Sequence, residues 1–244
     1  YVAYLFASDA GGFGEDEDEN IIKCGSYTGN GSTDGPVINL GWEPQYILVK
    51  RADGTSSWYI SDIMRGIPTG GTVSALEANT SAAEVNSYPI MAVQATGFQI
   101  KNSGTTFNAS GGTYIYIAIR RPMKTPESGT EVFAMDTLGA TAPNPPRFTS
   151  GFPVDMSIDI SRTTAAKNFV TGRLVAETYL NTASSDDEAT GETEETFDYQ
   201  DGWNSGGGTS TDILSYMFKR ATGFFDMVAY TGDGTTPRNI THNL

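Results

Sequence analysis

The sequence is nearly without the residues that build most catalytic and metal sites. Its 244 residues include one cysteine, Cys24, and one histidine, His242. A single cysteine forms no disulfide within the chain, so packing and strand pairing must hold the fold together. One of each is also too few for a zinc site made from these residues. We interpret His242 as a solvated turn residue and Cys24 as a small buried side chain.

Basic residues are also few. The 15 Lys and Arg face 29 Asp and Glu, which gives a formal net charge of −14. Nucleic acid and anionic bilayers repel a surface of this sign, so we expect no nucleic-acid partner. No apolar run reaches the roughly 20 residues of a membrane helix, so we expect no membrane insertion. The opening YVAYLFA lacks the basic flank of a signal peptide, and we interpret it as a strand.

Glycine and aromatic residues, by contrast, are abundant. The chain has 28 Gly, 12 Tyr, 12 Phe and 3 Trp, and 38% of its residues are hydrophobic. This composition predicts short strands joined by turns around a sizeable core. The glycine-rich stretch YTGNG at 27–31 recurs as YTGDG at 230–234, which suggests an internal repeat.

Four further landmarks recur in the same order, roughly 100 residues apart. They are LGWEPQYILV with SGFPVDMSIDI, 76–84 with 180–188, Gly97-Phe98 with Gly202-Trp203, and 114–121 with 213–220. Their shared order predicts two complete repeats and parts of two others. We expect 1–20 to hold the last strand of a preceding repeat and an acidic Gly-rich linker. Residues 21–121 form the first repeat, 122–130 a linker, 131–220 the second repeat, and 221–244 the first hairpin of a following one.

The predicted fold class is all-β: tandem antiparallel β-sandwich repeats of about 100 residues, with at most short helical turns. The segment 114–119 is apolar on both faces, so an opposing sheet, a loop or another chain must cover each face. Capping-box patterns at 81–84 and 185–188 predict a single helical turn or an ordinary Ser-rich turn. The pattern over 161–180 also fits a helix, which would contradict the all-β prediction.

Several of these stretches resemble a known repeat. YVAYLFA, KCGSYTGNGSTDGPVINLGWEPQYILVKR, ANTSAAE, TGFQI and FNASGGTYIYIAI are similar to a tandem repeat domain of unknown function in bacteriophage, often marine phage, tail fibre and virion proteins. The resemblance covers nearly all of the chain, although the acidic stretch SSDDEATGETEETFDY departs from the pattern. It implies a structural and adhesive role on the virion surface and brings no catalytic residue.

Among candidate binding residues, Trp58 is the one we assign to carbohydrate binding, because it lies beside a turn where its ring could stack on a sugar. Trp42 and Trp203 align with Phe152 and Phe98 in the other repeat, which is typical of core rings. We predict no catalytic residue, no metal site and no cofactor. The acidic runs at 15–19 and 186–198 are interpreted as solvated loops, with calcium binding as the alternative.

The function that these features favour is a structural virion protein, a segment of a phage tail fibre or similar appendage involved in host attachment. The chain is then not an enzyme. Its expected partners are copies of itself, as a homotrimer by analogy with phage fibres, other virion proteins and host surface glycans. The alternatives are a glycan-binding adhesin module and a polysaccharide depolymerase, whose paired carboxylates are set by space and not by sequence.

Overall fold

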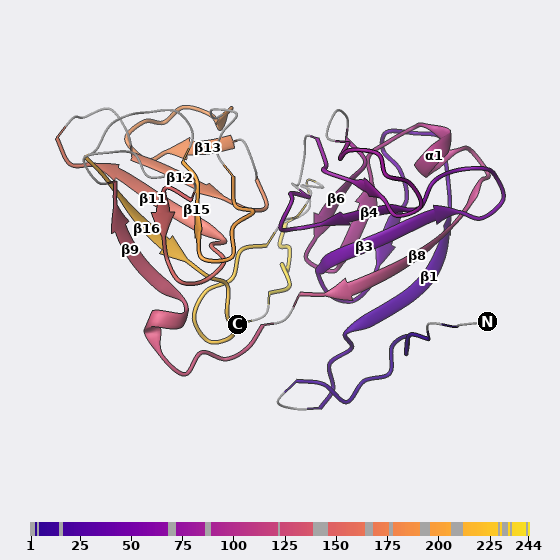
Figure 1. Cartoon of the computed structure of the whole chain (residues 1–244), viewed down its shortest axis with the longest axis horizontal. Helices are drawn as coiled ribbons and strands as arrows, with labels where there is room; N and C mark the ends of the chain where they lie inside the picture. The colour runs from indigo at the N-terminus through magenta and orange to yellow at the C-terminus, as the bar shows by residue number, and fades with distance from the viewer. Residues whose placement is uncertain are drawn as a thin grey trace. The chain divides into compact units, whose positions relative to one another are not determined.

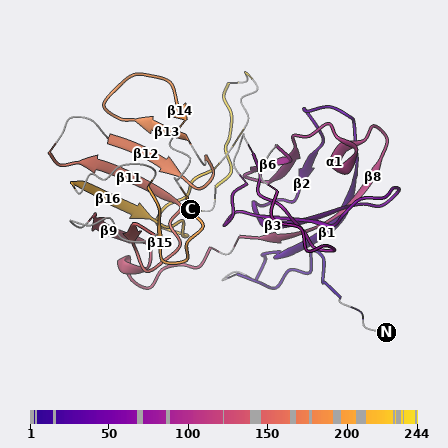
Figure 2. The same ribbon diagram turned by 45° about the horizontal axis from the view of Figure 1, so that its top comes forward.

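The computed structural model places the chain in two compact units, which Figures 1 and 2 show in two views. Unit 1 comprises Tyr1–Ile63, Ile67–Pro122 and Ala229–Thr241. Unit 2 comprises Met64–Gly66, Met123–Val228 and His242–Leu244. The structure describes residues 3, 5–14, 17–67, 72–85, 89–121, 123–138, 146–163, 168–175, 178–190, 196–205, 212–228, 230, 234, 236–242 and 244.

The regular structure of both units is almost entirely antiparallel strand, which confirms the predicted all-β class. The elements of unit 1 are β1 (Ile22–Thr28), β2 (Val37–Asn39), β3 (Pro44–Arg51), β4 (Tyr59–Asp62), β5 (Leu76–Glu77), β6 (Met91–Gln94), β7 (Gly97–Ile100), α1 (Thr105–Asn108) and β8 (Thr113–Arg120). Those of unit 2 are η1 (Gly129–Glu131), β9 (Phe133–Thr137), β10 (Phe148–Thr149), β11 (Met156–Ser161), β12 (Asn168–Gly172), β13 (Thr178–Asn181), β14 (Ala189–Thr190), β15 (Gly202–Trp203) and β16 (Ile213–Phe218).

The two units share one strand order. In unit 1 the larger sheet runs β1-β8-β3-β4-β5, and the smaller sheet runs β2-β7-β6. In unit 2 the larger sheet runs β9-β16-β11-β12-β13-β14, and β10 pairs with β15. Each strand of unit 1 except β6 therefore has a counterpart in the same place among the described strands of unit 2, which also has β14 at the end of its larger sheet. In both units the last long strand, β8 or β16, lies between the first and the third, as Figure 1 shows.

The sequence landmarks occupy equivalent places in these sheets. Gly97 pairs with Asn39 and Gly202 with Thr149, and each glycine precedes a buried ring, Phe98 or Trp203. A Cβ on Gly97 would lie 1.9 Å from the Ile38 carbonyl oxygen. A Cβ on Gly202 would lie 2.0 Å from the Phe148 carbonyl oxygen. The recurring Gly-aromatic pair thus serves the same close approach between two strands in each unit.

Rings from the smaller sheet join it to the larger one. Phe98 on β7 meets the ring of Tyr116 on β8 edge-on, with centroids 5.6 Å apart. In unit 2 the indole Nε1 of Trp203 on β15 donates to Ser215 Oγ on β16 at 3.0 Å. Trp203 is 1% exposed and stacks on Phe148. Each unit is therefore a sandwich-like pair of sheets with its core between them.

The YTGNG stretch is a structural turn anchored on α1. Tyr27 stacks on Tyr114 with ring centroids 4.9 Å apart, and its hydroxyl donates to the Phe107 carbonyl at 2.8 Å. Burial, with a contribution from Tyr114, raises the pKa of Tyr27 far above its usual value. The buried side chain of Asn108 accepts from the Asn30 N–H at 2.8 Å and donates to the Ser32 carbonyl at 2.7 Å. The corresponding turn residues 231–233 of YTGDG lie outside the described residues.

The expected helical turns at 81–84 and 185–188 do not form. The N–H of Ala82 binds Thr80 Oγ1 at 3.2 Å, and the N–H of Asp186 binds Ser184 Oγ at 3.3 Å. Each of these hydrogen bonds closes a Ser/Thr turn that begins one residue before the stretch, close to the Ser-rich turn of the alternative interpretation. The described helical residues are instead those of α1 and η1.

The region 161–180 holds β12 and the start of β13, and none of its described residues is helical. The described residues of 1–7 contain no strand, although one is expected there, and the residues that follow contact β1. The N–H of Asp9 donates to the Ile22 carbonyl at 2.9 Å, and Ser8 Oγ accepts from the Cys24 N–H at 3.0 Å. The described residues of 221–244 likewise contain no strand. The described residues also contain no helix with the length and hydropathy of a membrane span.

Gly97→Ala and Gly202→Ala should each destabilise the protein by roughly 2–3 kcal/mol, because the new methyl group overlaps a carbonyl oxygen of the paired strand. Gly129→Ala is the matched control, since a Cβ there has no atom within 4 Å, and it should change stability by less than about 0.5 kcal/mol. Urea denaturation followed by fluorescence measures all three. Equal stability of Gly97→Ala and Gly129→Ala would refute the close approach.

Candidate functional site

Trp58 lies immediately before β4, with its backbone tied to the edge of the sheet. Its carbonyl accepts from the Ala78 N–H and its own N–H donates to Asn79 Oδ1, both at 2.8 Å. The side chain is 38% exposed. Since successive side chains of a strand alternate between faces, the ring lies on the same face as Ile60. Trp58 is therefore accessible to a ligand, as carbohydrate binding requires.

Glu77, on the edge strand β5, lies close to Trp58 in the sheet, and its carboxylate accepts three hydrogen bonds. Its oxygens accept from the hydroxyls of Tyr59 at 2.9 Å, Ser57 at 3.0 Å and Thr80 at 3.1 Å. These hydrogen bonds, that of Tyr59 first, hold the pKa of Glu77 below its usual 4.5. Ser57 and Tyr59 flank Trp58 in the sequence, so by alternation Glu77 faces away from the indole ring. The two side chains do not form one site.

A row of apolar side chains crosses the outer face of the larger sheet in unit 1. Leu76, Ile60, Leu48, Ile117 and Cys24 are directly paired from strand to strand, one on each of the five strands. None of them is buried, and both ends of the row are exposed, Leu76 at 38%. The alternate residues point into the core. We call this set the unit 1 row.

Unit 2 has a corresponding row of side chains at the equivalent positions of its paired strands. Leu180, Val170, Ile158, Tyr216 and Met135 are paired in the same way on β13, β12, β11, β16 and β9. Leu180 is 52% exposed and Met135 is 60% exposed. We call this set the unit 2 row. Neither row contains a charged residue, so each unit presents an uncharged apolar strip to the outside.

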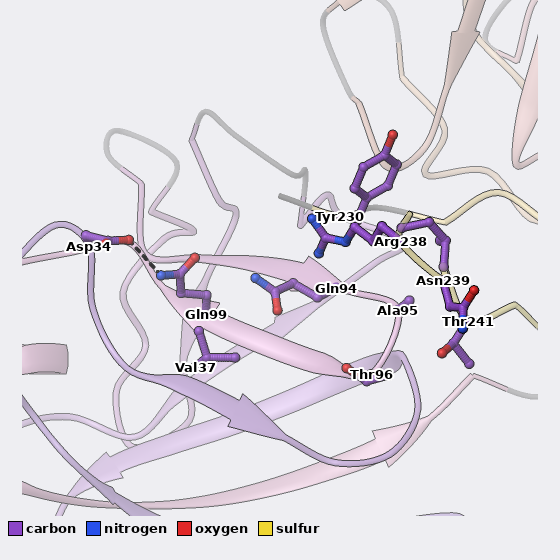
Figure 3. A pocket seen from close by; sticks show the side chains of 11 residues that line it. Asp34, Val37, Gln94, Ala95, Thr96, Gln99, Tyr230, Arg238, Asn239 and Thr241 are labelled. Atoms are coloured by element: carbon purple, nitrogen blue, oxygen red, sulfur yellow. Dashed lines mark hydrogen bonds between the residues drawn. The ribbon is translucent and has the colours of Figure 1, made fainter. Parts of the chain in front are cut away.

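A pocket of about 360 Å³ lies within unit 1, beside the β6–β7 hairpin (Figure 3). Its polar lining includes Asp34, Gln94 and Gln99, and the amide of Gln99 donates to Asp34 Oδ1 at 2.8 Å. On the other side Arg238 lies over the ring of Tyr230, 5.2 Å from its centroid. Figure 3 shows the side chains of Gln94 and Gln99 next to each other on adjacent strands. Amide and carboxylate groups of this kind suit hydroxyl-rich ligands.

The interior of unit 2 is more polar than that of unit 1, a feature that the sequence analysis missed. At matching registers Ser157, Asp159 and Ser215 replace Ile47, Val49 and Tyr116. All three polar residues are buried, Ser157 and Ser215 completely. The alternation of MSIDIS on β11 is the signal that could have shown it. Because these groups are closed off from solvent, they form no accessible site.

Buried charges in unit 2 are used in structural contacts. Arg173 Nε lies 3.3 Å from Asp155 Oδ1, and Arg220 Nε lies 2.7 Å from Asp226 Oδ1, with all four side chains at most 3% exposed. The other oxygen of Asp155 accepts from the Arg220 N–H at 2.7 Å. Buried pairs of this kind fix neighbouring loops against the sheet, and loss of one partner is costly.

The remaining candidates from the sequence are Cys24, His242, Trp42 and Trp203. Cys24 is exposed, which corrects the expectation that it is buried, because its side chain lies on the outer face of β1. His242 is exposed, and its Nδ1 accepts from the Leu244 N–H at 3.1 Å. Trp42 and Trp203 are buried, with only 6% and 1% of their surface exposed, as expected of core rings.

The acidic runs are only partly described, since 15–16 and 191–195 lie outside the described residues. Glu19 pairs with Arg120 at 2.8 Å, and the backbone N–H of Asp186 donates to Ser184 Oγ at 3.3 Å. Within the described part of the chain no three His, Cys, Asp or Glu side chains are grouped as a metal site would require.

Residues 1–122, half of the chain, match the domain of unknown function DUF7483. The chain therefore belongs to this family. The matched range ends at Pro122, where the second segment of unit 1 also ends. The curated proteins and the solved structures give no match.

Glu77 should make stability depend on pH. Because its folded-state pKa lies below 4.5, the ionised carboxylate stabilises the fold above that value, and this contribution is lost as the pH falls through the folded-state pKa. The stability gap between wild type and Glu77→Gln should therefore be full at neutral pH and shrink at acid pH. Urea denaturation across this range measures it.

Tyr59→Phe removes the shortest of the three hydrogen bonds and leaves the carboxylate in place. It should reduce the pH dependence that Glu77 contributes without removing it. Parallel stability profiles of wild type and Glu77→Gln from neutral pH to about pH 3 would show that Glu77 makes no such contribution.

Proposed function

We propose that this DUF7483 chain is a structural, non-enzymatic segment of a phage tail fibre or similar virion appendage involved in host attachment. The observation that carries the proposal is the repetition of one strand order, in the same register, in two units joined in series. Units of one design placed in tandem extend a structure, since each adds the same length of folded chain. The resemblance of the sequence to phage appendage repeats supports the virion location.

The roles of the acidic groups support a passive segment. Asp155 and Asp226 neutralise buried arginines, and Glu77 binds three hydroxyls of its own sheet. Asp212 is held in the same way by Ser161 and Thr163, whose hydrogen bonds lower its pKa. The remaining excess of negative charge keeps an extended appendage soluble.

Self-association belongs to this proposal. The unit 1 and unit 2 rows leave apolar side chains on the outside of both sheets, and packing against identical chains would cover them. A homotrimer is the stoichiometry that the analogy with phage fibres favours. Other virion proteins are the remaining proposed partners.

A glycan-binding module is the second candidate, favoured by the exposed ring of Trp58 and by the amide-lined pocket beside β6 and β7. An aromatic ring offers a flat apolar surface to a sugar, and amides supply hydrogen bonds to its hydroxyls. In this candidate the chain would contact host surface glycans directly, with no bond cleaved.

The structural proposal predicts that antibodies against this segment decorate an appendage of the particles that carry it, as seen by electron microscopy. It also predicts no release of reducing ends when the purified segment is incubated with host envelope polysaccharide. Sustained release that Asp198→Asn abolishes would show a depolymerase and contradict the proposal. Antibody label confined to free protein, with bare particles, would contradict the virion location.

The glycan-binding candidate predicts retention of the wild-type chain on immobilised host polysaccharide. Trp58→Ala should reduce retention because the stacking ring is lost, whereas Trp58→Phe keeps a ring and should retain more. Equal retention of all three chains would exclude Trp58 as the contact. Variants at Gln94 and Gln99 then test the pocket independently.

A further inference from the structure

We propose that the pocket beside the β6–β7 hairpin of unit 1 binds a neutral sugar through two adjacent hydroxyl groups. The inference rests on the glycan-binding candidate stated above, to which it adds the site and the class of sugar. Trp58 is not among the residues that line the pocket. The volume of about 360 Å³ is near the lower end of the roughly 300–1,000 Å³ of ligand pockets, so it suits a small ligand.

Asp34 is fixed at the pocket by the turn that precedes β2. Its N–H donates to Ser32 Oγ at 3.0 Å, and its carbonyl accepts from Asn30 Nδ2 at 3.1 Å. Its carboxylate oxygen Oδ1 accepts from the Gln99 amide at 2.8 Å and lies 3.8 Å from Lys101 Nζ. The other oxygen, Oδ2, has no such contact within the described part of the chain. The side chain is 86% exposed, so Oδ2 can accept a hydrogen bond from a ligand.

Gln99 presents a second acceptor next to this carboxylate. The residue is 6% exposed, and its amide nitrogen donates to Asp34 Oδ1 at 2.8 Å and to the Gly35 carbonyl at 3.1 Å. Both amide hydrogens are therefore used, which fixes the orientation of the amide group. No described residue donates to its oxygen, Oε1. Figure 3 shows this oxygen on the side of Gln94.

Gln94 supplies donors on the neighbouring strand. Ala92, two residues before Gln94 on β6, pairs with Gln99 on β7. Because side chains two residues apart on a strand share a face, Gln94 and Gln99 lie on the same face of the smaller sheet. Their side chains are next to each other in Figure 3, yet no hydrogen bond joins these two described residues. The Gln94 amide and Gln99 Oε1 thus leave a donor and an acceptor open to the same pocket.

This arrangement selects a ligand whose groups both donate and accept hydrogen bonds. One sugar hydroxyl can accept from the Gln94 amide and donate to Gln99 Oε1, while the adjacent hydroxyl donates to Asp34 Oδ2. The second of these bonds is made to a charged acceptor, which strengthens it. An ammonium group could use the acceptors but not the donor, and a carboxylate could use the donor but not the acceptors. A polyhydroxylated ring uses all of them.

Arg238 is the group among the described lining residues that could attract an acidic sugar. Its guanidinium lies over the Tyr230 ring, 5.2 Å from the centroid, which is a favourable contact for the cation. The carboxylate of Asp34 lines the same pocket and repels an anion. The net charge of −14 adds to this repulsion. We therefore expect neutral sugars to bind more tightly than their acidic counterparts.

Unit 2 differs from unit 1 at the positions that form the pocket. β6, which provides Gln94, has no counterpart among the described strands of unit 2. Asn204 takes the place of Gln99, two residues after the glycine of the Gly-aromatic pair, and is 7% exposed. The chain should therefore bind the sugar at one site, in unit 1.

An NMR titration of the whole chain with methyl glycosides tests the site. Methyl glucoside, methyl galactoside and methyl mannoside are the neutral probes, and methyl glucuronide is the acidic one. At least one neutral probe should bind with a Kd on the order of 1 mM and shift the side-chain amide signals of Gln94 and Gln99. Methyl glucuronide should bind about threefold or more weakly than the best neutral probe, because its carboxylate meets Asp34.

Two variants with a matched control assign the contacts. Asp34→Asn keeps an oxygen for Gln99 but turns the free acceptor into a donor, so it should weaken binding of the best neutral probe about tenfold or more. Gln94→Ala removes the donor and should weaken binding about threefold or more. Asp186→Asn makes the same change of charge at an exposed position of unit 2 and should bind as the wild type does. Circular dichroism verifies that all three variants are folded.

The outcomes separate this site from the functions proposed above. Equal binding by Asp34→Asn and the wild type, or tighter binding of methyl glucuronide, would overturn the assignment. If no neutral probe binds while the wild-type chain is retained on host polysaccharide, the pocket is not the sugar site, and the glycan-binding candidate stands without it. If that retention is also absent, both fail. Labelling of the appendage decides the structural role in every case.

Discussion

The fold depends on one pairing constraint, the insertion of the last long strand of each unit between the first and the third. In unit 1, β8 pairs with β1 and β3 along nearly its whole length, and in unit 2, β16 pairs with β9 and β11. Because a shift of one residue would turn every side chain to the other face, these pairings fix which residues enter the core. They also fix which residues form the outer rows.

The second sheet closes each unit through a glycine that no other residue can replace without strain. Gly97 and Gly202 let one strand approach the carbonyl of another, and the ring that follows each enters the core. From there the two units diverge. Unit 1 fills its inner face with Ile47 and Val49, whereas unit 2 places Ser157 and Asp159 at those positions. The same strand arrangement thus encloses an apolar inner face in unit 1 and a more polar one in unit 2. Buried polar groups of this kind generally need hydrogen-bond partners.

The carboxylates for which the structure shows several contacts take part in structural interactions. The carboxylates of Asp155 and Asp226 bind arginines of their own unit, and that of Glu77 binds hydroxyls of its own sheet. These contacts stabilise the fold. An uncharged row of partly exposed side chains on the outer face of the larger sheet is a feature that both units share.

The sequence by itself determined the all-β class, the recurrence of the landmarks and the core rings, because these depend on composition, on order and on spacing along the chain. Trp42, Trp203 and the Gly-aromatic pairs could all be recognised in this way. The local conformation of 81–84 and 185–188 could not, since the same Ser-x-x-Glu pattern fits a helical turn and a stretch that follows a Ser/Thr turn.

Only the tertiary structure decided what lies side by side. Trp58 and Glu77 are close in the sheet yet point to opposite faces, and Cys24 is exposed because β1 turns it outward. The five members of each row come from five strands that are distant in sequence, so no local pattern brings them together. Strand order and register are properties of long-range pairing, and they alone turn scattered apolar residues into a continuous surface.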